Sequence, residues 1–221
     1  MEIVEQEAYV ISLEKDPIIK IRVVPGHFAT VSSHTNSYLD MSGLKNKSLE
    51  ARDVARELAL PYLSSASVET IVCIERTQII AAYLAEELAD SGLVVNSNND
   101  INILTPISNI NGQWIFQDNV LDMIADKDIV LLVPTISSGR TVQNVMNCIN
   151  YYGGNLVGIS VLFLISGINL SEEVKKILHP LFTTEDAPDF RTYEVGECEM
   201  CRAGQKLDAL INSEGYRSLS G

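Results

Sequence analysis

The sequence predicts an α/β protein with a mainly parallel, twisted sheet and helices on both faces. From residue 70 onward, β-rich runs alternate with amphipathic segments, the pattern of parallel strands joined by helical crossovers. The runs 128–133 and 156–165 are almost continuously apolar, as expected of strands buried on both faces. Between them, residues 141–151 carry an apolar stripe at helical spacing, and Gly153-Gly154 stops the predicted helix.

The remaining elements follow from local patterns. Two strands are predicted at 7–13 and 18–24, after which Pro25-Gly26 interrupts the pattern and residues 27–46 are predicted to be irregular. Asn111-Gly112, between β-rich runs at 101–105 and 113–116, is a strong hairpin signal. The other predicted elements are helices at 48–63, 77–90, 171–178 and 204–211 and a strand at 70–74.

Composition and charge restrict the classes of function. The 221 residues are 46% hydrophobic and 20% charged, which is enough for a buried core and argues against disorder. The net charge of −13 repels phosphate backbones, so nucleic acid is not expected as a partner. No apolar run reaches the ~18–20 residues of a membrane span, and the N-terminus lacks the basic start of a signal peptide. We therefore expect a cytoplasmic protein without membrane contact.

A candidate phosphate-binding loop follows the apolar run at 128–133. Residues 135–141 are rich in small hydroxyl side chains and lead directly into a predicted helix. Backbone N–H groups and the positive end of the helix dipole would converge there, at the carboxyl end of a strand. Ser137, Ser138 and Thr141 add hydroxyl donors, and Gly139 permits close approach of an oxygen. An ordinary strand-to-helix turn capped by Ser and Thr remains the alternative, because the loop is neither a Walker A nor a G-x-G-x-x-G motif.

The segment Ser137-Ser138-Gly139-Arg140-Thr141 resembles the phosphoribosyl-pyrophosphate (PRPP) motif of type I phosphoribosyltransferases, and orotate phosphoribosyltransferases most closely. The resemblance implies that Thr135 and residues 137–141 bind the 5′-phosphate. Gly26–Tyr38 looks like the N-terminal hood segment of that family, through the shared anchors Gly26, Phe28, Ser32 and Tyr38. This likeness implies a nucleobase near the hood residues Phe28, Ser33, His34 and Asn36, although a solvated loop is an equal alternative for His34.

Three positions depart from the family pattern. Val133 and Pro134 stand where the family has two acids that hold the ribose, so no catalytic residue is assigned. The stretch 105–118 contains no Lys or Arg, whereas the family closes a lysine loop over pyrophosphate. The expected pyrophosphate loop carries no glycine; Arg76 there could contact phosphate or pair with a neighbouring carboxylate, and the loop comprises Glu75, Arg76, Thr77 and Gln78.

Two functions follow from the resemblance and its departures. The first is an enzyme that transfers phosphoribose from PRPP to a nucleobase with Mg²⁺, in nucleotide metabolism and pyrimidine biosynthesis. The second is a catalytically degenerate relative that binds a nucleotide or PRPP as a regulator or sensor. The resemblance also implies a homodimer. We expect one domain, with a hood segment (1–46), an α/β core (47–179) and a C-terminal tail (180–221), the two outer parts packed together.

Cys198 and Cys201 form a C-x-x-C in the tail, which is a metal-ligand spacing. A structural zinc site needs four ligands, and the three histidines (His27, His34 and His179) are scattered along the chain. A site completed by Cys73 or shared across a dimer is an alternative. The interpretation adopted is two reduced thiols at a turn, with no metal.

Overall fold

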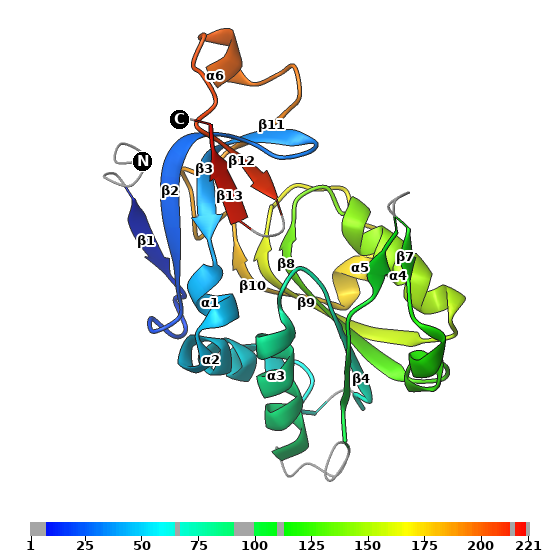
Figure 1. The fold of residues 1–221 in the computed structure, drawn as a ribbon. Coiled ribbons are helices and arrows are strands. Elements are labelled where there is room, and N and C mark those ends of the chain that lie inside the picture. Colours follow the sequence, from blue (N-terminus) through cyan, green and yellow to red (C-terminus); the bar gives the residue numbers. More distant parts are fainter. Residues whose placement is uncertain (1–7, 65–66, 91–99, 110–112, 213–214, 220–221) are drawn as a thin grey trace. The chain divides into compact units, whose positions relative to one another are not determined.

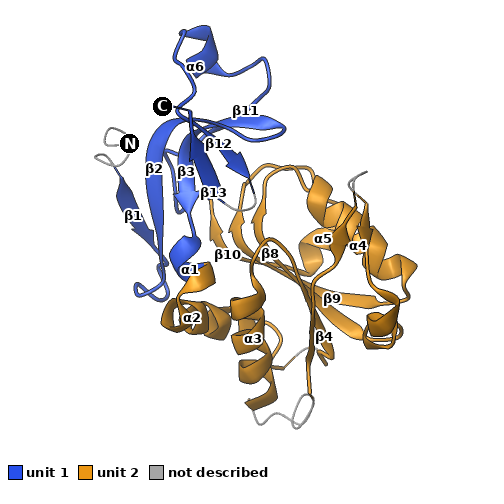
Figure 2. Ribbon diagram, viewed as in Figure 1, with its two compact units in different colours: residues 1–44, 184–221 blue, residues 45–183 orange. Residues whose placement is uncertain are grey.

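The computed structural model describes residues 8–64, 67–90, 100–109, 113–212 and 215–219. The chain divides into two compact units (Figures 1 and 2). Unit 1 combines residues 1–44 with residues 184–221, and unit 2 comprises residues 45–183. That the two units together form one domain stays a prediction.

Unit 2 contains the predicted parallel sheet. Within the described residues this sheet has five strands in the order β10-β9-β8-β4-β5, and every neighbouring pair is parallel. The fold class predicted from the sequence is confirmed. The strands are β4 (Thr70–Cys73), β5 (Asn102–Leu104), β8 (Asp128–Ile136), β9 (Asn155–Leu164) and β10 (Leu178–Thr183).

The central strand β8 is buried on both faces, which explains its apolar sequence. Ile129, Leu131 and Val133 point to one face, where they pack with apolar residues of helix α4 (Arg140–Tyr151). The intervening residues Val130 and Leu132 are equally buried, and strand alternation turns them to the opposite face. The other helices of unit 2 are α2 (Ser48–Ala59), α3 (Gln78–Asp90), α5 (Glu172–Lys176) and the 3₁₀ helix η1 (Asp118–Met123).

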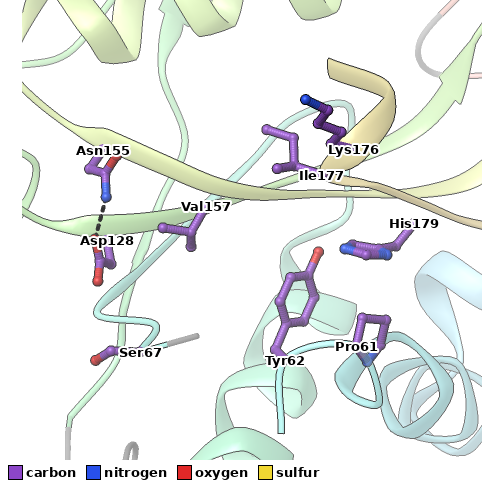
Figure 3. A pocket seen from close by; sticks show the side chains of 9 residues that line it. All are labelled: Pro61, Tyr62, Ser67, Asp128, Asn155, Val157, Lys176, Ile177 and His179. Atoms are coloured by element: carbon purple, nitrogen blue, oxygen red, sulfur yellow. Dashed lines mark hydrogen bonds between the residues drawn. The ribbon is translucent and has the colours of Figure 1, made fainter. Parts of the chain in front are cut away.

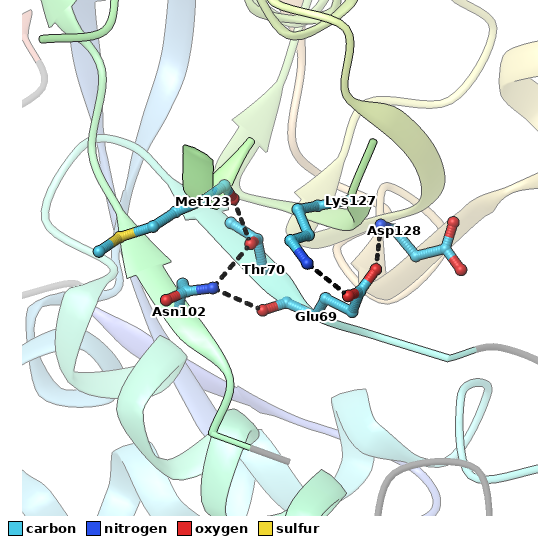
Figure 4. A network of polar contacts seen from close by, with 6 residues as sticks. All are labelled: Glu69, Thr70, Asn102, Met123, Lys127 and Asp128. Carbon is cyan, nitrogen blue, oxygen red and sulfur yellow. Dashed lines mark hydrogen bonds and ion pairs between the residues drawn. The ribbon is translucent and has the colours of Figure 1, made fainter. Parts of the chain in front are cut away.

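A polar network fastens the amino-terminal edge of this sheet (Figure 4). The Glu69 carboxylate accepts hydrogen bonds from Lys127 Nζ at 2.9 Å and from the Asp128 backbone N–H at 3.1 Å. Asn102 donates its side-chain amide to the Glu69 carbonyl at 3.2 Å. The Thr70 hydroxyl donates to the Met123 carbonyl at 2.6 Å. These bonds join the starts of β4, β5 and β8.

Unit 1 is built from both ends of the chain. Its described strands form a six-stranded sheet in the order β11-β3-β2-β12-β13, with β1 paired to β2. Helices α1 (Ser42–Asn46), which runs on into unit 2, and α6 (Glu199–Arg202) are short. The strands are β1 (Tyr9–Ser12), β2 (Lys20–Ala29), β3 (Ser33–Asp40), β11 (Thr192–Glu194), β12 (Ala209–Asn212) and β13 (Gly215–Ser218).

Several local predictions are corrected. Residues 27–46 are not irregular, because β2 continues to Ala29 through a bulge between Pro25 and Phe28, and β3 follows. The predicted helix at 204–211 is wrong, since this segment leads into β12, and the helical turn lies earlier, at α6. Tertiary strand pairing overrides local helix propensity there.

The predicted pairing of 101–105 with 113–116 is also wrong. Residues 102–104 join the main sheet as β5, and β7 (Trp114–Ile115) pairs instead with β6 (Ile107–Ser108). Asn111-Gly112 lies outside the described residues. Across the described part of the chain, no helix is both long and apolar enough to cross a membrane.

Candidate phosphate-binding site

The candidate phosphate loop lies at the carboxyl end of β8. The strand continues to Ile136, so Thr135 is a strand residue and the loop begins at Ser137. Ser137 and Ser138 are exposed, and Gly139 takes a left-handed conformation with a φ of 74° just before α4 begins at Arg140. A side chain at position 139 would be strained by this φ, and its Cβ would lie 2.9 Å from Leu170. The glycine is therefore required by the turn itself.

The N-terminus of α4 has the features of an anion-binding helix end. Its N-cap, Gly139, supplies no side-chain hydrogen bond, and no acidic residue occupies its first turn. The Ser138 hydroxyl lies 3.5 Å from the Arg140 N–H, the upper limit for a hydrogen bond. Helix α5 differs, because Ser171 caps its Val174 N–H and two acidic residues follow. The positive end of the α4 dipole is not neutralised by the loop, and an anion would do so.

The loop after β4 lies at the same edge of the sheet, because β4 and β8 are parallel neighbours. Glu75 and Arg76 both have positive φ, at 52° and 66°. Two consecutive non-glycine residues in this region cost about 1 kcal/mol or more each, and such strain concentrates at functional sites. Thr77 is fully buried and donates its hydroxyl to the Ile74 carbonyl at 2.8 Å, which holds the loop at the start of α3.

Glu75 lies in this loop, two residues after β4 ends at Cys73. Burial raises the pKa of Glu75, and the positive charge of Lys45 opposes the rise. A partly desolvated carboxyl group in a strained loop at the carboxyl edge of a parallel sheet is a candidate for ligand contact. The sequence placed Glu75 in the expected pyrophosphate loop, but its positive φ and its burial have no local sequence signal.

Val133 and Pro134, at the two positions where the family has acids, have no functional group that could bind a ligand. Val133 is buried in the core under α4. Pro134 is also buried and lies within β8, just beyond Leu132, whose carbonyl accepts from the Ile74 N–H. Because strand residues alternate in direction, the backbone of Pro134 faces the β4 side of β8, as that of Leu132 does. Strand β4 has already ended at Cys73, so the N–H that proline lacks would have had no strand residue of β4 to bond. Neither side chain can hold a ribose hydroxyl.

In the stretch that stands in place of the family's lysine loop, β6 and β7 pair antiparallel. Asn109 and Gln113 are joined beside this pair by a backbone bond of 2.8 Å and a side-chain bond of 3.0 Å between their amides. The Asn109 side chain also accepts from the Gln113 N–H at 2.9 Å. These two amides are therefore engaged in holding β6 against β7.

Two cavities in the described part of unit 2 lie at opposite ends of the strands. One of about 280 Å³ is bordered by the phosphate loop and the first turns of α4, with Asn169 and Ser171 on its other side. The second, of about 450 Å³, lies at the amino-terminal ends of β8 and β9, where Asn155 donates to Asp128 at 2.6 Å (Figure 3). Ligands of open parallel sheets bind at the carboxyl ends of the strands. The first cavity is therefore the better candidate.

The predicted hood residues lie in unit 1 and are engaged there. Phe28 is fully buried in a cluster with Val24 and Ala209, so its ring presents no face to a base. Asn36 accepts from the Arg191 N–H and donates to the Asp189 carbonyl, both at 2.7 Å. Ser33 shares a hydrogen bond of 2.8 Å with the Thr30 hydroxyl.

His34, the fourth hood residue, lies beside His27 and the C-x-x-C. The ligand atoms of His27, His34, Cys198 and Cys201 all lie within 4.8 Å of one another. The interpretation of the histidines as scattered is therefore wrong. The missing signal was the pairing of β2 and β3 with the C-terminal segment, which no local pattern reveals.

Comparison with known proteins identifies the fold. No family model matches the sequence, and no curated protein matches it. Among solved structures, orotate phosphoribosyltransferase of Mycobacterium tuberculosis H37Rv in complex with Fe(III) dicitrate aligns with a TM-score of 0.51 at 11% identity, covering 74% of this chain and 90% of that one. Adenine phosphoribosyltransferase from Rhodothermus marinus aligns with a TM-score of 0.48 at 14% identity, over 81% and 96% of the two chains. The fold of this chain is thus that of the type I phosphoribosyltransferases.

Proposed function

We propose that the protein binds a phosphorylated ribose compound, PRPP or a nucleotide, at the carboxyl edge of the unit 2 sheet. The observation that carries the proposal is the uncapped, acid-free N-terminus of α4 behind Ser137, Ser138 and Gly139. The strained loop at Glu75 and Arg76 supports it from the neighbouring strand. Binding without transfer accounts best for this site, because Val133 and Pro134 offer no carboxylate.

The helix end itself supplies a sharp test. Thr141, the second residue of α4, is exposed. Aspartate at this position favours the helix dipole but repels phosphate. We expect Thr141→Asp to weaken PRPP binding at least about 10-fold in calorimetric titration, while the protein remains folded.

A matched control is available in the same unit. Leu49 is the second residue of α2 and is exposed, so Leu49→Asp places the same charge at the same position of another helix. Leu49→Asp should leave PRPP affinity unchanged. Equal binding by Thr141→Asp and the unsubstituted protein, or no binding of any phosphorylated ribose, would refute the phosphate site.

Phosphoribosyl transfer to a nucleobase such as orotate is the second candidate. One observation favours it: Glu75 offers a partly desolvated carboxyl group at the correct edge of the sheet. An active enzyme would bind PRPP tightly only with Mg²⁺ and convert orotate, and Glu75→Gln would abolish turnover. Binding of orotidine monophosphate that is indifferent to Mg²⁺, without turnover, would support the sensor instead. The homodimer stays a prediction, which sedimentation of the purified protein would check.

A further inference from the structure

Four side chains with metal-ligating atoms meet within unit 1. His27 lies on β2, His34 on β3, Cys198 immediately before α6 and Cys201 inside it. Their ligand atoms all lie within 4.8 Å of one another, and both cysteines are free thiols. His27 and Cys198, which are 171 residues apart in sequence, are almost completely buried.

The distances between these atoms fit the edges of a coordination tetrahedron. With Zn–N bonds of about 2.0–2.1 Å and Zn–S bonds of about 2.3 Å, tetrahedral geometry separates two nitrogens by about 3.3 Å and a nitrogen from a sulfur by about 3.6 Å. His27 Nε2 lies 3.1 Å from His34 Nδ1. The Cys198 and Cys201 sulfurs lie 3.5 and 3.6 Å from His27 Nε2, and the Cys201 sulfur lies 3.3 Å from His34 Nδ1.

Hydrogen bonding alone does not satisfy this arrangement. His27 Nδ1 lies 3.0 Å from the Gln205 carbonyl oxygen, which can only accept, so Nδ1 carries the proton of the neutral ring. His27 Nε2 then has a single lone pair, yet three groups approach it: His34 Nδ1 and both sulfurs. One cation at the centre of the four atoms would take one lone pair from each.

The surroundings of His27 have the form expected around a metal ligand. A ligating histidine typically donates its other ring N–H to a carbonyl or carboxylate, which fixes the ring, and the Gln205 carbonyl occupies that place. The His27 backbone is held on both sides by Asp208, whose carboxylate accepts from the His27 N–H at 2.7 Å. The Asp208 N–H donates in turn to the His27 carbonyl at 2.8 Å. Strand pairing of Tyr193 with His34 directs the chain toward Cys198.

We propose that His27, His34, Cys198 and Cys201 bind a single structural Zn²⁺ ion. Two imidazoles and two thiolates form a tetrahedral set that zinc prefers, and the two thiolates balance its charge at this partly buried position. A Rieske cluster is excluded by the geometry, because its histidines bind one iron and its cysteines the other, whereas here each measured nitrogen–sulfur pair fits one ion. With four protein ligands, the site has no open position for catalysis.

The ion would fasten the C-terminal segment to the N-terminal hairpin β2–β3. Residues 184–221 bury few apolar side chains; among those described, they are Ala187, Phe190, Cys198 and Ala209. A metal bond between the two ends of the chain would supply stability that this small apolar surface does not.

Metal analysis of the purified full-length protein tests the proposal directly. After expression in zinc-supplemented medium, we expect about one zinc per chain. Replacement by Co²⁺ should give the visible absorption of tetrahedral cobalt together with a sulfur-to-cobalt charge-transfer band. Purified protein without stoichiometric metal that also fails to bind added Zn²⁺ or Co²⁺ would overturn the proposal. Recovery of a Cys198–Cys201 disulfide from protein purified under reducing conditions would also overturn it.

Variants distinguish the site from adventitious binding. Cys201 is exposed, so Cys201→Ala should leave unit 2 folded while reducing bound zinc at least about 10-fold. His34→Ala should do the same, whereas His34→Cys preserves four ligands and should retain the ion. Cys148→Ala and His179→Ala remove the same residue types from unit 2 and should retain full zinc content. Full zinc content in folded Cys201→Ala, or zinc loss in Cys148→Ala, would contradict the assignment.

Discussion

The central strand β8 and the C-terminal segment 184–221 are held in place by different means. β8 buries every residue from Ile129 to Pro134 on both faces of a parallel sheet. The C-terminal segment instead relies on short strand pairings, side-chain bonds such as those of Asn36 and Asp208, and the proposed zinc ion. The stability of β8 comes from many apolar contacts, so it does not depend on any single polar group. The stability of the C-terminal segment comes from a few hydrogen-bonding and metal-ligating atoms, so the loss of one of them should be costly. The difference teaches which substitutions each region withstands.

Loss of a zinc ligand should change the stability of the C-terminal segment more than any other substitution described below changes stability. Cys198→Ser removes a buried ligand, and we expect the C-terminal segment to lose about 4 kcal/mol or more of stability. Limited proteolysis with mass spectrometry should then show rapid cleavage within 184–221, while residues 45–183 stay protected. Equal protection of both regions would show that the segment does not depend on the metal.

A cavity created in β8 should destabilise unit 2 and leave the C-terminal segment unaffected. Leu131 is fully buried between β4 and β9, so Leu131→Ala should cost about 2–5 kcal/mol in denaturant unfolding of unit 2. Zinc content should not change, because the metal ligands belong to unit 1. Leu49→Ala, at an exposed leucine of the same unit, serves as the control and should cost less than about 0.5 kcal/mol.

Overpacking tests how tightly unit 2 is filled. A Cβ at Gly158 would lie 2.3 Å from the Tyr62 ring, and Tyr62 is fixed by its hydroxyl bond of 2.8 Å to Ser160. Gly158→Ala should therefore cost about 1–3 kcal/mol, measured by thermal unfolding. Adding Tyr62→Leu should make the combined cost less than the sum of the single costs, since it removes the clash. Full additivity would mean that Gly158 and Tyr62 do not compete for space.

The smallest expected effect concerns the half-buried ion pair of Glu69 and Lys127 at the amino-terminal edge of the unit 2 sheet. The pKa of Glu69 lies below its ordinary value of 4.5, chiefly because Lys127 donates to it and next because the Asp128 N–H does. The ionised carboxylate thus stabilises the folded state above pH 4.5, and this contribution is lost as the pH falls through the lowered pKa. Glu69→Gln should lower the melting temperature slightly at pH 7 and flatten its decrease in acid; a parallel decrease in both proteins would disprove the assignment.

The sequence predicted the regions whose signals are local. The apolar run of β8 and the stripe of Val142, Val145 and Ile149 identified the strand and helix around the phosphate loop correctly. The alternation of elements identified the parallel sheet. The Cys₂His₂ cluster escaped prediction because its two halves are brought together only by strand pairing across most of the chain, as between His34 and Tyr193.

Building unit 1 from both ends of the chain sets an order of events during translation. Residues 45–183 leave the ribosome with all the strands of their sheet before Cys198 and Cys201 exist as part of the chain. The hairpin that carries His27 and His34 is made first, and its partner strand β11 and the two proposed cysteine ligands follow only after the whole of unit 2. A chain whose translation stops before β11 would thus contain the described strands of the unit 2 sheet but expose an unpaired strand edge at β3.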